Sequence, residues 1–155
     1  MTPARWLRVQ FIKARRKGYV NNAELDPPVT DNVRNCAEAG EDFIVKVVAK
    51  TGARYWLTDR RLLLEHVHEV YTLFRYEEVC EAHWIEKDCL RRAFDTPDPQ
   101  RTISEMKSEY FDRIEVELSA RNRPVVLEGL DQAYSPVLGF LRYFKRAEKT
   151  GPPSR

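Results

Sequence analysis

The sequence has few glycines, and their arrangement excludes several classes of enzyme. Six glycines are spread over 155 residues, and they form no Gly-x-Gly-x-x-Gly fingerprint, Walker loop or Gly-x-Ser-x-Gly elbow. Carboxylates such as Glu77, Glu78, Glu115 and Glu117 are typical of solvated faces and do not suggest a converging acid–base pair. The sequence therefore predicts a protein that is not an enzyme and that carries no cofactor.

Cysteine and long apolar runs are also scarce. Cys36, Cys80 and Cys89 are odd in number and irregular in spacing, with no Cys-x-x-Cys, so three reduced thiols are expected. No apolar run approaches the roughly 18 residues that span a bilayer. Residues 1–6 lack the apolar core and cleavage site of a secretory signal. These absences predict a cytoplasmic protein.

Acidic residues are missing from the first 23 positions, which hold six basic residues. These are Arg5, Arg8, Lys13, Arg15, Arg16 and Lys17. Because the whole chain has 26 basic and 24 acidic side chains, the remaining residues carry more acid than base. A mildly acidic body argues against a large nucleic-acid-binding face. The positive charge is concentrated in the N-terminal arm.

This arm has the periodicity of an amphipathic helix. Leu7, Phe11 and Ala14 recur at i, i+4 and i+7 between Pro3 and Lys17. Surface helices usually pack by their apolar face, so the first expectation is that the arm docks on the body with its cations in solvent. Two alternatives stay open. The arm can lie on an anionic membrane, or it can bind nucleic-acid phosphates, a partner that the acidic body disfavours.

A second helix is predicted near the C-terminus, over residues 135–148. Ser135 is a suitable N-cap, and Pro136 suits the first helical position. Four apolar side chains repeat at i, i+3, i+4 and i+7 and should be buried. They are Val137, Phe140, Leu141 and Phe144.

Between the helices, short segments rich in β-branched and aromatic residues predict an antiparallel β body. Within residues 40–65, three strands are separated by Thr51-Gly52 and Asp59-Arg60, the spacing of two tight hairpins. In the first strand, Phe43, Val45 and Val47 are expected on one face and Ile44 on the other. Further strands are expected over residues 71–76, 81–87, 111–120 and 125–127. Pro27-Pro28 indicates a linker, which divides the chain into a helix and linker (1–35) and a domain (36–155).

One motif in this body resembles bacterial pleckstrin-homology-like (PH-like) and GRAM-like domains. It runs from Arg54 to Leu64 as a strand pair with the pattern Tyr-x-Leu-Thr-x-x-Arg-Leu, followed by Phe74 to Val79. The resemblance covers about residues 40–148. It implies a mainly β fold, an antiparallel β-sandwich or partly open barrel of about seven strands that a C-terminal helix caps. It implies an adaptor or envelope-associated module and no defined chemistry.

The motif departs from lipid-binding pleckstrin-homology domains in its basic residues. Lys46, Lys50 and Arg54 are spaced by four, whereas those domains carry two basic residues one position apart that grip phosphates. The resemblance therefore does not imply phosphoinositide binding, since a fold alone supplies no site.

The functional prediction is a non-enzymatic interaction module for a protein or peptide, which adds to a sheet edge or lies beside the final helix. Its candidate partner-binding residues are Trp56, Tyr71, Lys46, Lys50 and Arg54. The alternative is peripheral association with an anionic membrane through the basic arm. A third alternative, a small metal-dependent enzyme, would use His66, His68 and His83 as ligands. Surface histidines are the simpler interpretation, so no metal is predicted.

Overall fold

The computed structural model describes residues 2–16, 20–84 and 113–150, with side chains up to residue 143. Lys17, Cys89, the irregular segment 89–109 and the ends of two predicted strands (85–87 and 111–112) lie outside the described residues. So does the side chain of Phe144.

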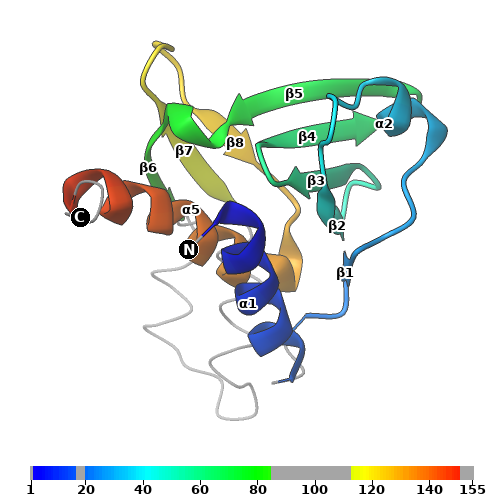
Figure 1. The fold of residues 1–155 in the computed structure, drawn as a ribbon, viewed down its shortest axis with the longest axis horizontal. Helices are drawn as coiled ribbons and strands as arrows, with labels where there is room; N and C mark the ends of the chain where they lie inside the picture. The colour runs from blue at the N-terminus through cyan, green and yellow to red at the C-terminus, as the bar shows by residue number, and fades with distance from the viewer. Residues whose placement is uncertain (1, 17–19, 85–112, 151–155) are drawn as a thin grey trace, which may run out of the picture.

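Eight strands form two antiparallel sheets in the described part of the chain (Figure 1). The five-stranded sheet contains β1 (Ala23–Leu25), β2 (Phe43–Val48), β3 (Arg54–Thr58), β4 (Arg61–His66) and β5 (Glu69–Arg75), side by side in that order. The three-stranded sheet contains β6 (Val79–Trp84), β7 (Ile114–Leu118) and β8 (Val125–Leu127). The described helices are α1 (Pro3–Arg16), α2 (Asp31–Asn35) and α5 (Tyr134–Thr150), with short 3-10 turns η1 (Tyr76–Glu78) and η2 (Asp131–Ala133).

The predicted fold class is confirmed: the protein is mainly β, with two antiparallel sheets, a C-terminal helix and an N-terminal helix. The strand count exceeds the expected seven by one because β1 forms within the stretch predicted as linker. It pairs with β2 through Ala23 and Val47, so the chain around it runs along the sheet. The described strands leave two separate sheets, which do not close into a barrel.

The main core fills the space between the inner face of the five-stranded sheet, the other sheet and the two long helices. α5 packs on β6, and α1 packs on α5 and β2. Leu7 and Phe11 of α1 are fully buried in this core, so the arm docks on the body by the face that its apolar spacing predicts. Buried side chains of the sheets and of α5 complete the core, among them Ile44, Leu57, Phe74, Ile114, Leu127, Phe140 and Leu141.

A second, smaller core lies on the opposite face of the five-stranded sheet. There Val33 of α2 packs against Phe43, Trp56 and Leu63. We call the segment that covers this outer face, residues 27–42, the strap. Because apolar residues of β2, β3 and β4 are buried on both faces, their burial patterns show little of the alternation of a half-exposed strand.

The predicted faces of the first strand are wrong at its start. A register shift between Phe43 and Val45 places Phe43 in the smaller core and Ile44 in the main core with Val45 and Val47. An extra residue in one strand of an antiparallel pair interrupts the two-residue alternation. The simple alternation therefore fails at the bulge and holds after it.

The C-terminal helix begins earlier than predicted. Its first residue is Tyr134, directly after η2, so Ser135 lies inside the first turn and is not the N-cap. Pro136 still fits, because the first turn of a helix has no internal partner for its N–H groups. The predicted burial of Val137, Phe140 and Leu141 is confirmed.

Candidate functional site

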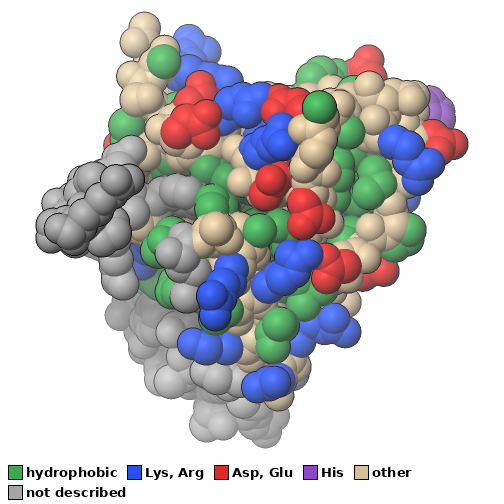
Figure 2. Space-filling model, viewed as in Figure 1, with side chains coloured by type: hydrophobic (Ala, Val, Ile, Leu, Met, Phe, Trp, Pro, Cys, Tyr) green, Lys and Arg blue, Asp and Glu red, His purple; other side chains and the backbone are tan. Residues whose placement is uncertain are grey.

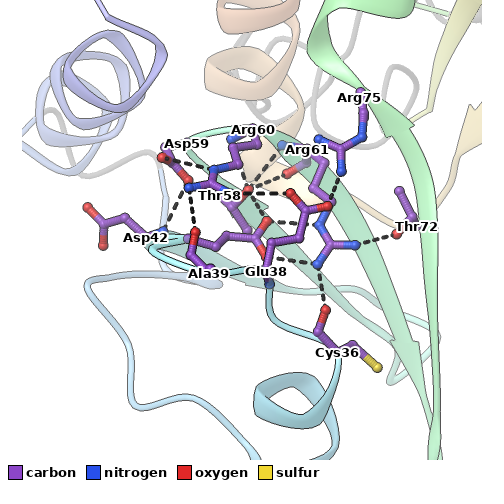
Figure 3. A network of polar contacts seen from close by, with 11 residues as sticks. Cys36, Glu38, Ala39, Asp42, Thr58, Asp59, Arg60, Arg61, Thr72 and Arg75 are labelled. Atoms are coloured by element: carbon purple, nitrogen blue, oxygen red, sulfur yellow. Dashed lines mark hydrogen bonds and ion pairs between the residues drawn. The ribbon is translucent and has the colours of Figure 1, made fainter.

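A polar network joins the strap to the turn between β3 and β4 (Figure 3). At its centre the Arg61 guanidinium forms a bidentate pair with Glu41, with Nε and Nη2 each donating to a carboxylate oxygen at 2.8 Å. Nη1 donates to the Thr72 hydroxyl and Nη2 to the Cys36 carbonyl, both at 2.7 Å. The two ionic side chains are 8% and 0% exposed. Paired in this way, Arg61 fixes the end of the strap to β4 and β5.

Two further arginines hold the same part of the strap. Arg60 donates to Glu38 at 3.3 Å and to the Ala39 carbonyl at 2.9 Å. Arg75 donates to the other carboxylate oxygen of Glu38. We call this group, Glu38, Glu41, Arg60, Arg61 and Arg75, the clamp. Its carboxylates and guanidinium groups are satisfied by one another, which is the arrangement of a structural network.

The electrostatics of the clamp favour its charged form. Burial by itself would raise the pKa of Glu41. Hydrogen bonds from Arg61, the Glu38 backbone N–H and Thr58, with the positive charge of Arg61, instead hold that pKa below its ordinary value. The pKa of Arg61 is raised in turn, chiefly by its hydrogen bonds to Glu41. Glu41 is therefore ionised at neutral pH and acts as the anchor of the clamp.

A second anchor of the strap surrounds Glu65, which is buried. Its carboxylate accepts hydrogen bonds from the Trp56 indole at 3.1 Å, from Arg54 at 3.3 Å and from the Thr30 hydroxyl at 2.8 Å. Trp56 is 0% exposed beneath the strap. The structure thus places this predicted partner-binding residue in a core, where its indole N–H is already used.

The other predicted basic residues of the body lie in ion pairs. Lys46 is 3.2 Å from Glu24 and stands over the Trp56 ring, 5.9 Å from its centre. Lys50, near the turn between β2 and β3, is 4.0 Å from Asp131. Arg54 pairs with Glu65, as described above. Lys46, Lys50 and Arg54 therefore pair with three different carboxylates and do not converge on one ligand.

Tyr71 is the exposed aromatic residue of the predicted set. It lies on β5, is 48% exposed, and donates its hydroxyl hydrogen to Glu69. β5 is the last strand of the five-stranded sheet and has β4 as its one partner strand among the described residues. Val67, in the adjoining turn, is 71% exposed and has a φ of 56°, a conformation that costs a β-branched residue energy.

The three histidines do not assemble. His66 ends β4 and His68 follows in the turn to β5, whereas His83 lies on β6 in the other sheet, 3.2 Å from Glu115. The residues that the structure describes contain no group of three or more His, Cys, Asp or Glu side chains placed to hold a metal ion. Cys36 and Cys80 are exposed free thiols.

The cations of α1 differ from those of the sheet. Arg8 pairs with Asp26 at 2.5 Å and lies 3.6 Å from Asp42. The remaining described cations of the helix are exposed and make no ion pair with a described residue; they are Arg5, Lys13, Arg15 and Arg16. Figure 2 shows blue side chains over the region of α1, below an area where blue and red side chains mix.

A pocket of about 240 Å³ opens where the C-terminal part of α1 meets the start of α5. Lys13 is the one ionisable side chain in its described lining. Gln132, also in the lining, accepts a hydrogen bond from the Asn21 backbone N–H at 3.1 Å. The rest of the lining consists of Gln10, Ala14, Val20, Ser135 and Pro136.

Sequence reasoning missed the clamp and its residues Glu38, Glu41 and Arg61. The available signal was the pair of adjacent arginines, Arg60 and Arg61, at a predicted hairpin. Two cations at the start of a strand need acidic partners if another segment of the chain covers them. Nothing local points to Glu41, which is 20 residues away from Arg61.

Comparison of the chain with protein-family models, curated proteins and solved structures gives no match. Among the described helices, none combines the length and the apolar character that crossing a bilayer requires. Conclusions about function therefore rest on the geometry of the surfaces described above.

Proposed function

We propose that the protein is a non-enzymatic interaction module that binds an extended peptide as an additional strand along β5. The observation that carries the proposal is the free edge of β5, which is seven residues long and hydrogen-bonded to β4 alone among the described strands. An edge strand presents unpaired N–H and C=O groups, and a peptide that pairs with them gains main-chain hydrogen bonds.

The other edges in the described residues are less suitable. β1 and β8 have three residues each, too few for a ladder of several hydrogen bonds. β6 is longer than these two strands, but α5 packs against it. α2 also contacts β5, where Val70 packs on the smaller core at the outer face of the sheet. In Figure 1, β5 runs along the upper border of the molecule, away from both long helices.

Exposed side chains near β5 can supply selectivity. Tyr71 offers an aromatic ring on the strand, and Val67 offers an exposed aliphatic side chain at the hairpin tip. Aromatic residues are enriched at protein interfaces, where one ring buries a large area. The outer face of the sheet is less suitable, because the strap covers Trp56 and Leu63.

The order of the elements is compatible with the PH-like resemblance, which supports a binding module. Four consecutive antiparallel strands (β2–β5) precede three more (β6–β8) and a capping helix. Within this proposal β1 and α1 are additions to that order. A fold analogy does not identify the ligand, so the site proposal depends on the β5 edge.

The test uses a displayed library of random peptides, selected on the immobilised full chain. Hydrogen exchange of the complex with an enriched peptide should show new protection in β5 and none in β8. Tyr71→Ala should lower the affinity for the peptide by roughly tenfold, since an aromatic residue at an interface often contributes over 1 kcal/mol to binding. Val126→Ala, an exposed apolar residue of β8, is the matched control. Protection centred elsewhere, or the absence of any enriched peptide, contradicts the proposal.

A further inference from the structure

We propose that the outer face of α1 binds the surface of an anionic phospholipid bilayer. This proposal is independent of the peptide site on β5. It rests on how α1 is oriented, on which of its cations make no ion pair with a described residue, and on the apolar side chains that lie among them.

The orientation of α1 is set by its buried side. Leu7 and Phe11 point into the main core, so the opposite side of the helix faces outward. Arg5, Val9, Ile12 and Arg16 follow one another at i, i+4, i+7 and i+11 and therefore form a single stripe along that outward side. We call it the α1 stripe.

The stripe combines charge with apolar surface. Its two arginines are exposed and make no ion pair with a described residue, and Lys13 and Arg15 extend the cationic area beside it. Ile12 is 40% exposed between them, and Val9 is partly exposed. Exposed apolar side chains flanked by basic residues are typical of helices that lie in a membrane interface.

α1 is packed along α5 in the absence of a ligand. It runs antiparallel to α5, as three successive contacts show: Trp6 stacks on Tyr143 at 4.8 Å, Gln10 lies against Gly139, and Ala14 shares a pocket with Pro136. A side chain at Gly139 would meet Gln10, with the Cβ 3.1 Å from its Oε1. The close approach of the two helices fixes the stripe, so binding does not require the helix to fold.

A lipid surface fits the stripe better than a nucleic acid. Phosphate backbones would attract the cations equally well, but they offer no apolar environment for Ile12 and Val9. The stripe also lacks exposed aromatic side chains on which bases could stack. With about 21 Å of helix and few apolar side chains, the expected binding is reversible and depends on salt.

The first experiment is sedimentation of the full chain with phosphatidylcholine vesicles that contain or lack phosphatidylserine. Binding is expected with the anionic vesicles alone. It should weaken as the Debye length falls from about 10 Å at 0.1 M salt to about 3 Å at 1 M. Failure to bind the anionic vesicles at low salt would overturn the proposal.

The decisive variant carries Arg5→Gln, Lys13→Gln and Arg16→Gln. At about fivefold for each basic residue near an anionic surface, the vesicle partition coefficient should fall by roughly a hundredfold. All three side chains are exposed, so the circular dichroism spectrum and the melting temperature should not change.

The matched control removes three exposed cations elsewhere, by Arg34→Gln, Arg121→Gln and Arg123→Gln. None of these arginines makes an ion pair with a described residue, and the net charge changes by the same amount. Vesicle binding should fall by less than about fivefold. Equal losses in the two triple variants would show attraction by net charge and would refute a site on α1.

Ile12→Ser separates the lipid surface from a nucleic acid. It should reduce vesicle binding at high salt, where the apolar contribution dominates, and leave any binding of a single-stranded oligonucleotide unchanged. An oligonucleotide that displaces the protein from anionic vesicles at equal phosphate concentration would assign the stripe to nucleic acid. Tyr71→Ala should leave vesicle binding intact, so failure of the peptide site is distinguishable from failure of the stripe.

Discussion

The same residue, arginine, has opposite environments on the outer face of the five-stranded sheet and on the outer face of α1. On the sheet, Arg54 and Arg61 donate to buried carboxylates. On α1, Arg5 and Arg16 have no ion-pair partner among the described residues. Counting basic residues alone does not distinguish the two groups. The position of the nearest carboxylate does.

The difference arises from where the acids lie in the chain. The carboxylates of the clamp, Glu38 and Glu41, come from the strap and reach arginines that are some twenty residues or more further along. α1 has no acid within a helical turn of any cation, because residues 1–23 contain none. Long-range pairing turns a cation into a structural group, and its absence leaves a cation available to a partner.

The largest expected effect contrasts the two sides of α1. Phe11→Ala should lower the free energy of unfolding by about 3–5 kcal/mol, because it removes an aromatic ring from the core. Ile12→Ala, one residue along and 40% exposed, should cost less than about 1 kcal/mol. Urea denaturation of both variants measures the difference. Similar losses would mean that α1 is not docked by the Phe11 side.

The next effect concerns the clamp. Glu41→Gln should cost about 3 kcal/mol, because it leaves Arg61 buried beside an uncharged partner. The paired change Glu41→Leu with Arg61→Met should recover much of that loss, since apolar residues can replace a buried ion pair. Chemical denaturation of the three proteins provides the test. A loss of unfolding free energy below about 1 kcal/mol for Glu41→Gln would show that the clamp does not anchor the strap.

A smaller part of the same effect should appear on acidification. The pKa of Glu41 is lower in the folded state than its ordinary value of 4.5. Its contribution to stability is therefore complete above about pH 4.5 and is lost as the pH falls through the folded-state pKa. Unfolding free energies measured over pH 3–6 should decline toward acid, and the decline should be shallower in Glu41→Gln. Parallel curves would contradict this assignment.

The smallest expected effect compares one arginine from each surface. Arg60→Gln should cost about 1 kcal/mol, because it breaks partly exposed hydrogen bonds to Glu38 and Ala39. Arg16→Gln should stay within about 0.5 kcal/mol of the parent protein. Replicate thermal melts of the two variants at matched pH and salt measure the difference in their stability. A larger loss at Arg16 would mean that the α1 stripe is a structural surface.

Sequence reasoning predicted the elements whose signals are local. β3 and β4 follow from short runs of aromatic and aliphatic residues, and β7 follows from alternating apolar and polar residues. α5 follows from Phe140 and Leu141 at helical spacing. β1 and α2 were missed because three- and five-residue elements beside Pro27-Pro28 have almost no periodicity of their own. Their stability comes from tertiary contacts with β2 and the smaller core.

The candidate site was less predictable than the fold. The sequence predicts Trp56 as a partner-binding residue because an aromatic residue on a strand fits either a core or an interface. Its burial depends on Val33 and Glu65, which the sequence does not link to it. The cations of α1 could be identified because their charge excess is local. The sequence does not show which of these cations are paired. That depends on the positions of Asp26 and Asp42, which among the cations of α1 lie near Arg8 alone.

The strap has a consequence for shortening the chain. A fragment that starts at residue 36 would lose Thr30 and Val33 and uncover Trp56 and Leu63, together with the indole N–H group and the Glu65 carboxylate that the strap helps to enclose. The uncovered sheet face would be apolar and open to a second copy, so self-association on expression is the expected behaviour. The smallest soluble unit should therefore retain the strap, and it should retain α1 as well because Leu7 and Phe11 fill the main core. In a series of N-terminal truncations, solubility should fall once Leu7 is removed.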